Sequence, residues 1–288
     1  MKKIIRFLVV CLFTLQASFA QNTGSSLLWE VSGNGLASPS YVLGTIHMIC
    51  KEDFFMPAAV QQAVERSQAI YLELKIDDPG LQMQMLQLLR LENGQNLQQI
   101  FGKEGYALLD SFFRARLNMS LSFFSGFKPF MALSLMYQKM LPCAVQQSYE
   151  MEFAGLARKY KKEIRGLETV ADQVAVFDAI PDSVEAASIL KMVQEFEAQQ
   201  TELNKMVQLY RSQDVEALYQ LSVRSEDMMG SAALLLENRN RKWIAPMEKA
   251  MQEGTTFFAV GAAHLGGPAG VLQLLREKGY SVKPVPLQ

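Results

Sequence analysis

The chain has only two histidines among its 288 residues, and both follow a glycine at the same spacing. Gly44 to His47 ends the apolar stretch SYVLGTIH, and Gly261 to His264 ends the apolar stretch FFAVGAAH. Histidine is the commonest metal ligand and the usual acid or base near neutral pH, so two histidines in matched Gly-x-x-His settings indicate one shared site. We therefore take His47 and His264 as the first candidates for catalysis or metal binding.

Two carboxylates occur in similar positions. Glu73 lies in the strand-like run AIYLEL, and Glu168 ends the run EIRGLE. A carboxylate in a half-buried strand costs free energy unless it is paired, hydrogen-bonded or bound to metal. In open α/β sheets, sites form beyond the carboxyl ends of the strands, which would gather both carboxylates and both histidines on one rim. Two other interpretations stay open: Glu73 could face solvent on an edge strand, and Glu168 could cap the helix that begins at Thr169.

The elements around these residues alternate between strand and helix. Short apolar runs bounded by turn residues predict strands over 27–31, 41–43, 69–74, 163–168, 255–260 and 280–285. Helical spacing of apolar residues predicts helices over 58–66, 81–91, 106–117, 129–141, 149–161, 169–179, 234–251 and 268–279, and a long helical run over 183–221. This order predicts an α/β core with a large central helical insertion.

The first 20 residues have the features of a secretory signal. A basic start precedes an apolar run over 7–15, and Ser18-Phe19-Ala20 fits a small-x-small cleavage site. We therefore predict a signal peptide over 1–20 and a secreted protein, located in a bacterial periplasm. The mature chain, 21–288, contains no stretch long and apolar enough to be a transmembrane anchor.

Charge and cysteine content limit the possible functions of the mature chain. The predicted signal holds three of the 28 Lys and Arg and none of the 29 Asp and Glu, which leaves a net charge of −4. That mild acidity gives no support to nucleic-acid binding. In an oxidising compartment Cys50 and Cys143 could form one disulfide, although Cys50 could instead be a soft metal ligand or a packing residue.

We expect 21–288 to form a single domain, because 268 residues can bury one large core. The helical insertion would occupy about 81–160 and 181–240, between strands of the core. The oligomeric state is left open by the sequence.

Five stretches together resemble the TraB/GumN family, which is related to the TIKI metalloproteases: YVLGTIH, IYLEL, GLET, ENRN and VGAAHLGGPAGVLQLLREKGY. The resemblance covers almost the whole mature chain. It implies an α/β fold with a mixed β-sheet core and surrounding helices. It also implies a metal-dependent hydrolase, with peptide cleavage the activity attributed to the TIKI branch. The chain departs from its relatives at Ala269, where an acidic residue is often found.

The resemblance also implies roles for particular residues. His47 and His264 correspond to the family's two motif histidines, and Glu73 to its first-strand carboxylate. Arg239 and Asn240 correspond to its late Arg-Asn pair, which places both among the candidate catalytic residues.

The chemistry of the residues themselves agrees with these roles. Two imidazoles and one carboxylate, from His47, His264 and Glu73, would leave coordination positions open, as in catalytic metal sites. Such a set suits zinc, manganese or cobalt, and does not choose among them. Glu168 is a candidate general base or fourth ligand, and Arg239 a candidate stabiliser of developing negative charge. We therefore predict a metal-dependent peptidase that acts on a peptide or protein substrate outside the cytoplasm.

A function of another class stays open. The chain could be a non-catalytic periplasmic binding or quality-control module, in which the histidines are structural and the Met-rich and aromatic helices hold an apolar ligand. A serine esterase has less support, because no Gly-x-Ser-x-Gly elbow is present.

Overall fold

The computed structural model describes residues 25–225 and 229–287, so the predicted signal peptide over 1–20 lies outside the described residues. A six-stranded sheet forms the centre, in the order β6-β4-β7-β2-β1-β8. Its strands in chain order are β1 (Leu28–Ser32), β2 (Ser40–Thr45), β4 (Ala69–Leu72), β6 (Glu163–Gly166), β7 (Thr256–Gly261) and β8 (Ser281–Val285). Two short strands, β3 (Ile49–Cys50) and β5 (Gln146–Gln147), pair separately.

The sheet is mixed, as the family resemblance implies. Strands β6, β4, β7 and β2 are parallel neighbours, whereas β1 runs antiparallel to both β2 and β8. The carboxyl ends of the four parallel strands therefore meet at one edge of the sheet. This edge is the position where a doubly wound sheet places its site.

Eleven α-helices lie in the described ranges, and together with the sheet they confirm the predicted α/β class. They are α1 (Ala58–Arg66), α2 (Leu81–Leu88), α3 (Leu97–Phe112), α4 (Pro129–Met140), α5 (Tyr149–Tyr160), α6 (Val170–Asp178), α7 (Asp182–Gln194), α8 (Phe196–Arg211), α9 (Val215–Ser222), α10 (Asn238–Glu253) and α11 (Val271–Glu277). A π-helical turn, η4 (Ala233–Glu237), leads into α10. No helix in these ranges is long and apolar enough to cross a membrane.

The long helical run predicted over 183–221 is divided into the three helices α7, α8 and α9. The second break falls at Gln213, whose φ of 61° is left-handed, and the next residue, Asp214, caps α9 by accepting a hydrogen bond from Ala217 N–H. Apolar periodicity continues across both breaks, so spacing alone did not reveal them.

The strands alternate their side chains between two apolar layers. Leu43 and Phe257 face α1 and α5 on one side, and their neighbours Val42 and Phe258 face α10 and α11 on the other. Period-2 alternation explains why both faces of these buried strands are apolar. The sheet is thus held rigidly between two layers of helices.

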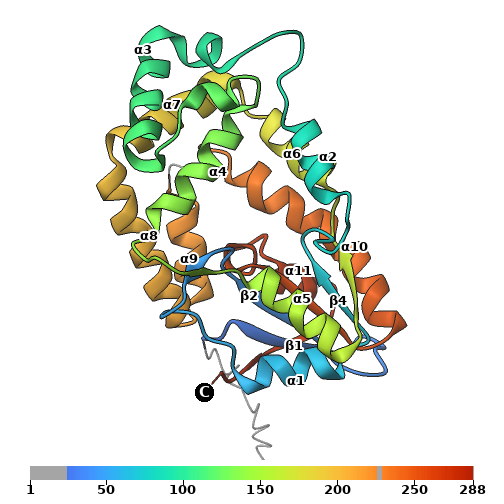
Figure 1. The fold of residues 1–288 in the computed structure, drawn as a ribbon. Helices are drawn as coiled ribbons and strands as arrows, with labels where there is room; N and C mark the ends of the chain where they lie inside the picture. The colour runs from blue at the N-terminus through green and yellow to red at the C-terminus, as the bar shows by residue number, and fades with distance from the viewer. Residues whose placement is uncertain (1–24, 226–228, 288) are drawn as a thin grey trace, which may run out of the picture.

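A separate group of helices lies away from the sheet layers. We call α3, α4, α7, α8 and η4 the helical lobe, which has its own apolar core around Phe113, Met136 and Ile189. Figure 1 shows α3, α4 and α7 at the far end of the molecule from α1 and the sheet. The lobe faces the edge of the sheet where the parallel strands end, since side chains from both line common pockets.

Glu185 on α7 gives this lobe a pH-dependent stability. Only 4% of the residue is exposed, and its Oε1 has no hydrogen-bond partner. Burial, together with the charges of Asp182 and Asp178, raises the pKa of this carboxyl to about 7. The folded protein therefore binds a proton that the unfolded chain releases above its ordinary pKa, and stability falls as pH rises from about 4.5 to 7.

We predict that Glu185→Gln removes this loss. The variant should match the wild type near pH 4 and exceed it by about 1–3 kcal/mol at pH 8, because no charge is buried at either pH. Urea unfolding at both pH values measures the difference. Glu104→Gln, on an exposed part of α3, is the control and should change little. An equal effect of Glu185→Gln at both pH values would contradict the prediction.

Candidate active site

The four predicted rim residues each follow the end of a parallel strand by one to three positions. Glu73 comes directly after β4, His47 and Glu168 two residues after β2 and β6, and His264 three residues after β7, in the 3-10 turn η5 (Ala262–His264). Because β2, β7, β4 and β6 are adjacent in the sheet, the topology brings these residues to one edge. The grouping expected from the strand-end rule is therefore what the fold produces.

Gly44 explains one part of the Gly-x-x-His pattern. A Cβ at Gly44 would lie 2.8 Å from Leu265 Cδ1 and 3.0 Å from Ala262 Cα. The missing side chain thus lets the turn that carries His264 pack directly against β2, the strand that leads to His47. The first glycine is a requirement for close approach between the two motifs.

Glu73 is buried, and the edge-strand interpretation is wrong. Strand β4 lies between β6 and β7, and only 8% of Glu73 is exposed. Its Oε1 accepts a hydrogen bond from Gly261 N–H at 2.9 Å, and its Oε2 accepts one from Gln173 Nε2 at 3.3 Å. The backbone of Glu73 also accepts a hydrogen bond from Glu168 N–H at 3.0 Å, which holds the two carboxylate residues side by side.

Arg239 on α10 joins the rim carboxylates. Its Nη2 donates to Glu73 Oε2 at 2.6 Å and to Glu168 Oε1 at 2.5 Å, and its Nη1 donates to Leu235 O at 3.0 Å. At most 13% of any of the three ionised side chains is exposed. Burial alone would raise the pKa of Glu73, but the Arg239 charge outweighs it and holds this pKa well below its usual range. The guanidinium is thus the fixed cation of the site.

Glu168 belongs to the rim and does not cap α6. The cap is Thr169, whose hydroxyl accepts a hydrogen bond from Asp172 N–H, with the Asp172 carboxylate bonded back to Thr169 N–H. The Glu168 carboxylate instead accepts hydrogen bonds from Arg239 and, at 3.1 Å, from Trp243 Nε1. Both of its oxygens are therefore engaged, and its main effect is to hold Arg239 in place.

Asn240 fixes the tautomer of His264. Its Nδ2 donates to two carbonyl oxygens, His264 O at 3.2 Å and Ala269 O at 2.9 Å, so its Oδ1 must be the acceptor for His264 Nδ1–H at 2.6 Å. The other ring nitrogen, Nε2, is then unprotonated and faces Arg239 Nη1 at 3.2 Å. Burial lowers the pKa of His264 to about 3, and Arg239 adds to this against the Glu73 charge. The ring is therefore neutral, with a lone pair directed into the site.

His47 lies on the same rim but is held more loosely. Its Nδ1 forms a 2.8 Å ion pair with Glu150 Oε1, and 70% of its side chain is exposed. Desolvation at the rim opposes the charged imidazole, but the hydrogen bond and charge of Glu150 outweigh it and raise the pKa of His47. A charged His47 must release its proton before it can bind a metal ion. This half of the site therefore differs in charge and mobility from the buried half.

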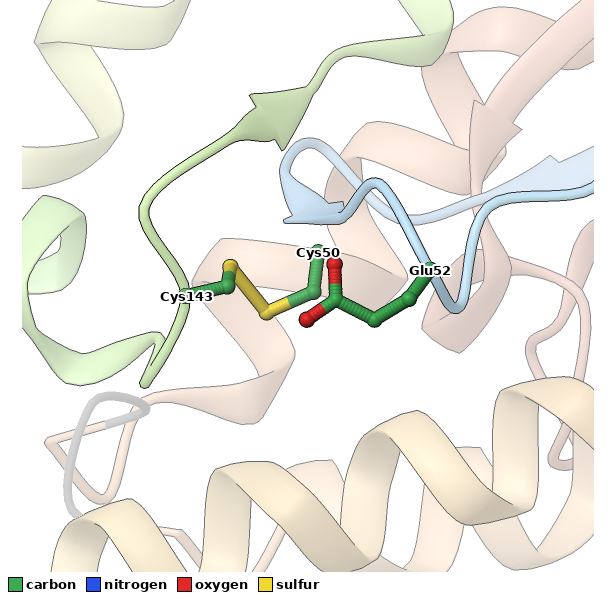
Figure 2. Close-up of side chains that lie close together, drawn as sticks. All are labelled: Cys50, Glu52 and Cys143. Carbon is green, nitrogen blue, oxygen red and sulfur yellow. A yellow bond between two sulfur atoms is a disulfide. The ribbon is translucent and has the colours of Figure 1, made fainter.

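The disulfide Cys50–Cys143 fastens the loop that carries His47. It lies beside the pair of short strands β3 and β5, with Glu52 next to it (Figure 2). Of the alternatives left open by the sequence, the structure has the disulfide, so Cys50 offers no thiolate and the soft-ligand interpretation is wrong. The bridge ties the His47 loop to the segment that leads into α5, where Glu150 lies.

The rim supplies donors that suit a divalent ion, but they do not surround one point in this conformation. The Nδ1 atom of each histidine is hydrogen-bonded to a side-chain oxygen, of Glu150 for His47 and of Asn240 for His264. Metal-binding imidazoles typically have such a hydrogen bond on the ring nitrogen that does not bind the metal. His264 Nε2 lies 3.9 Å from Glu73 Oε1. In the described part of the chain, however, only Cys50, Glu52 and Cys143 place three potential ligand atoms within 4.8 Å of one another. The disulfide accounts for that group, so a shared ion would require His47 to move toward His264 and Glu73.

Three further residues contribute to the rim and were not predicted. The ring of Trp243 lies 4.5 Å from that of His264 between centroids, and its Nε1 donates a hydrogen bond to Glu168. The sequence offered a signal for Trp243, because it follows Arg239 by four residues and so lies on the same face of the helix. Gln173, on α6, and Glu150, on α5, gave no signal, since polar residues in the first turns of helices are ordinary.

Comparisons with known proteins give matches over most of the chain. The model of the TraB/PrgY/gumN family matches residues 27–284. The chain is 22% identical over 324 residues to "Metalloprotease TIKI1" and 20% identical over 332 residues to "Metalloprotease TIKI2", both from Danio rerio. These matches cover 92% and 93% of the chain but 64% and 62% of the relatives, less than two thirds of their length. No solved structure gives a significant match.

We predict that Arg239→Met destabilises the protein by about 3–5 kcal/mol, because it leaves Glu73 and Glu168 buried without their cation. Chemical denaturation measures the loss. Arg114→Met is the matched control: its pair with Asp110 is largely exposed on the arginine side, so the cost should stay below about 1 kcal/mol. Adding Glu73→Gln and Glu168→Gln to Arg239→Met should restore part of the stability. A loss no larger than that of Arg114→Met would contradict the prediction.

We further predict that replacing both Cys50 and Cys143 by alanine lowers the free energy of unfolding by about 2–4 kcal/mol, since the bridge closes a long loop in the unfolded chain. Its two cysteines are 93 positions apart. Urea unfolding without reductant gives the value, and reduced wild type should behave like the double variant. Amide exchange of the segment around His47 should rise in the variant. Unchanged stability together with unchanged exchange would show that the bridge does not hold the rim.

Proposed function

Since this chain belongs to the TraB/PrgY/gumN family, we propose that it is a metal-dependent hydrolase that cleaves peptides. The observation that carries the proposal is the convergence of His264, Glu73 and Arg239 where adjacent parallel strands end. The distant relation to two proteins named metalloproteases supports the same reaction class. In this buried rim, His264 and Glu73 can bind a metal ion, and Arg239 adds a fixed positive charge that can stabilise a developing negative charge.

The buried half of the site has its protonation states set before any substrate arrives. His264 is neutral and oriented by Asn240, and Glu73 is ionised because Arg239 lies against it. Neither group needs to change its protonation state to coordinate an ion. His47, Glu73 and His264 would hold the metal ion, and zinc, manganese or cobalt all suit two imidazoles and a carboxylate. When bound, such an ion acts as a Lewis acid on a carbonyl oxygen and makes a neighbouring water more acidic.

Arg239 has a second use in hydrolysis. A carbonyl under attack develops negative charge on its oxygen, and a fixed cation in a desolvated site stabilises that charge. Arg239 is held by Glu168 and Leu235 O, so its orientation is set without the substrate. Glu168 is thereby a positioning residue for Arg239. A base that takes a proton from water is better supplied by Glu150, which lines one pocket together with Glu73 and is hydrogen-bonded to His47.

We also propose that the protein acts outside the cytoplasm. The disulfide Cys50–Cys143 supports this location, because such bridges persist in oxidising compartments. The signal-like composition of residues 1–20 agrees with it.

One observation favours a second candidate function. Arg239 Nη1 and Nη2 occupy the space between His264 Nε2 and Glu73, which an ion shared by these two residues would need. With Arg239 in this place the rim could bind the carboxylate or carbonyl of a ligand without cleaving it. Measuring metal content and peptide cleavage together decides between the two functions.

We expect the purified chain to bind one divalent ion and to cleave members of a quenched fluorescent peptide library. Chelation should abolish cleavage, and zinc, manganese or cobalt should restore it. His264→Ala should lose the ion, and Glu73→Gln should reduce cleavage at least about 100-fold, because a ligand is lost in each. Metal content by mass spectrometry and initial cleavage rates measure these effects.

Glu163→Gln is the matched control, since Glu163 is an exposed carboxylate at the opposite end of strand β6 from the rim. It should retain both the ion and the activity. Folding of each variant is checked by circular dichroism. If the wild type and His264→Ala contain equal metal and peptides bind but stay intact, the hydrolase proposal is wrong and the binding function is supported.

A further inference from the structure

The rim opens into a large pocket between the sheet edge and the helical lobe, which we call the apolar cleft. Its volume is about 450 Å³, in the range of ligand pockets. Its inner end is formed by His47, Glu73 and Arg239. Its walls come from α4, α6, α8 and η4 and include Phe130, Leu141, Val176, Phe177, Leu203 and Leu235. The reacting groups and the apolar walls therefore share one space.

The apolar walls of the cleft remain partly exposed to solvent. Phe130, Val176, Phe177 and Leu203 are each only half-buried, although their neighbours Leu133 and Met136 on α4 are fully buried. The rings of Phe130 and Phe177 are in contact, with centroids 4.0 Å apart and planes tilted by 35°. An apolar group that covers this exposed apolar area removes it from water, which favours binding beside the rim.

Polar side chains interrupt these walls at intervals. Ser134, Gln138 and Gln173 also line the cleft, and their hydroxyl and amide groups can donate and accept hydrogen bonds. Ser134 Oγ donates to Phe130 O and Gln173 Nε2 to Glu73, but each side chain can form further hydrogen bonds, which the N–H and C=O groups of a peptide backbone can supply and an alkyl chain cannot. The mixture of apolar walls and amide groups therefore fits a peptide better than a lipid tail.

The cleft also continues past the rim. Two smaller pockets, of about 220 and 260 Å³, adjoin it, and His47 lines all three. One is bounded by Leu74 and Ile76, the other by Tyr210 and Leu218. The pocket with Leu74 and Ile76 shares only His47, Glu73 and Gln173 with the cleft, so an extended substrate that passes His47 can place residues in both spaces.

We propose that the apolar cleft is the specificity pocket of this site and takes one large apolar side chain, aromatic or branched, of an extended peptide. The proposal rests on the proposed peptide hydrolysis for the identity of the rim, but it concerns binding and can be measured without cleavage. The rim holds the bond to be cleaved, and Phe130, Phe177 and Leu203 select the neighbouring residue.

The test uses equilibrium binding to the full-length protein. Fluorescent hexapeptides of alanine and glycine, each with one Phe, Leu, Ala or Glu at successive positions, are titrated and followed by anisotropy. At one position Phe and Leu should bind at least about tenfold more tightly than Ala or Glu, which is the discrimination expected of an apolar pocket. Glu163→Gln should keep this preference, because Glu163 is exposed and does not line the cleft.

Two substitutions close the cleft in different ways, and each has a control of the same kind. Val176→Trp fills it, and Val184→Trp places the same ring on the exposed surface of α7. Leu203→Glu puts a charge on its wall, and Leu86→Glu does so on the exposed surface of α2. The cleft variants should lose the preference for Phe and Leu, and the controls should keep it. Two independent variants guard against one that fails to fold.

The outcomes separate the two proposals. Selective binding that Val176→Trp or Leu203→Glu removes supports the specificity pocket even when no peptide is cleaved. Peptides cleaved without side-chain preference, or a preference that both variants retain, overturn the pocket and leave the hydrolase standing. Tight binding of a dodecanoyl probe, with no peptide bound at any position, would also overturn it and assign the cleft to an acyl chain.

Discussion

The structure depends on one buried cation between two buried carboxylates. Arg239 holds Glu73 and Glu168 at hydrogen-bond distance in a region that is almost closed to solvent. Two carboxylates cannot remain ionised there without a partner, and a guanidinium cannot be buried there without them. Helix α10 must therefore lie across the ends of β4 and β6, and its next residue, Asn240, is placed to orient His264. The chemistry of the rim follows from this pairing.

The sheet and the loops contribute differently to the rim. The buried half is fixed by strand register, by the close approach at Gly44 and by the hydrogen bond between the backbones of Glu168 and Glu73. In the other half, the side chain of His47 is mostly exposed and that of Glu150 is partly buried, and a disulfide restrains the His47 loop. A rigid half that keeps its protonation state and a looser half that can gain or lose a proton are suited to different parts of a hydrolytic reaction.

The charged residues of the rim and the apolar residues of the cleft come from different elements. Side chains at the ends of the parallel strands and at the start of α10 supply the charged groups, whereas α4, α6, α8 and η4 supply the apolar cleft. The lobe has a core of its own around Phe113 and Met136, so the walls of the cleft can change without disturbing the sheet.

The sequence by itself determined the class of the fold and the four residues that the strand ends bring to the rim. Apolar runs ending in Gly-x-x-His or in a glutamate predicted strands whose carboxyl ends carry His47, Glu73, Glu168 and His264, because strand-end geometry depends only on local pattern and a general rule of α/β sheets. The resemblance to the family added Arg239 and Asn240. Helix breaks such as the one at Gln213 escaped prediction, because apolar spacing continues through them.

Only the tertiary structure decided which groups face one another. That Arg239 lies between Glu73 and His264, that Glu150 binds His47, and that the disulfide fastens their loop are contacts between segments far apart in the chain. No local pattern encodes such contacts. The apolar cleft is the clearest case, since its walls come from four separate helical segments. Each of them shows the same apolar spacing as a core helix, and packing alone determines which apolar side chains remain half-buried beside the rim.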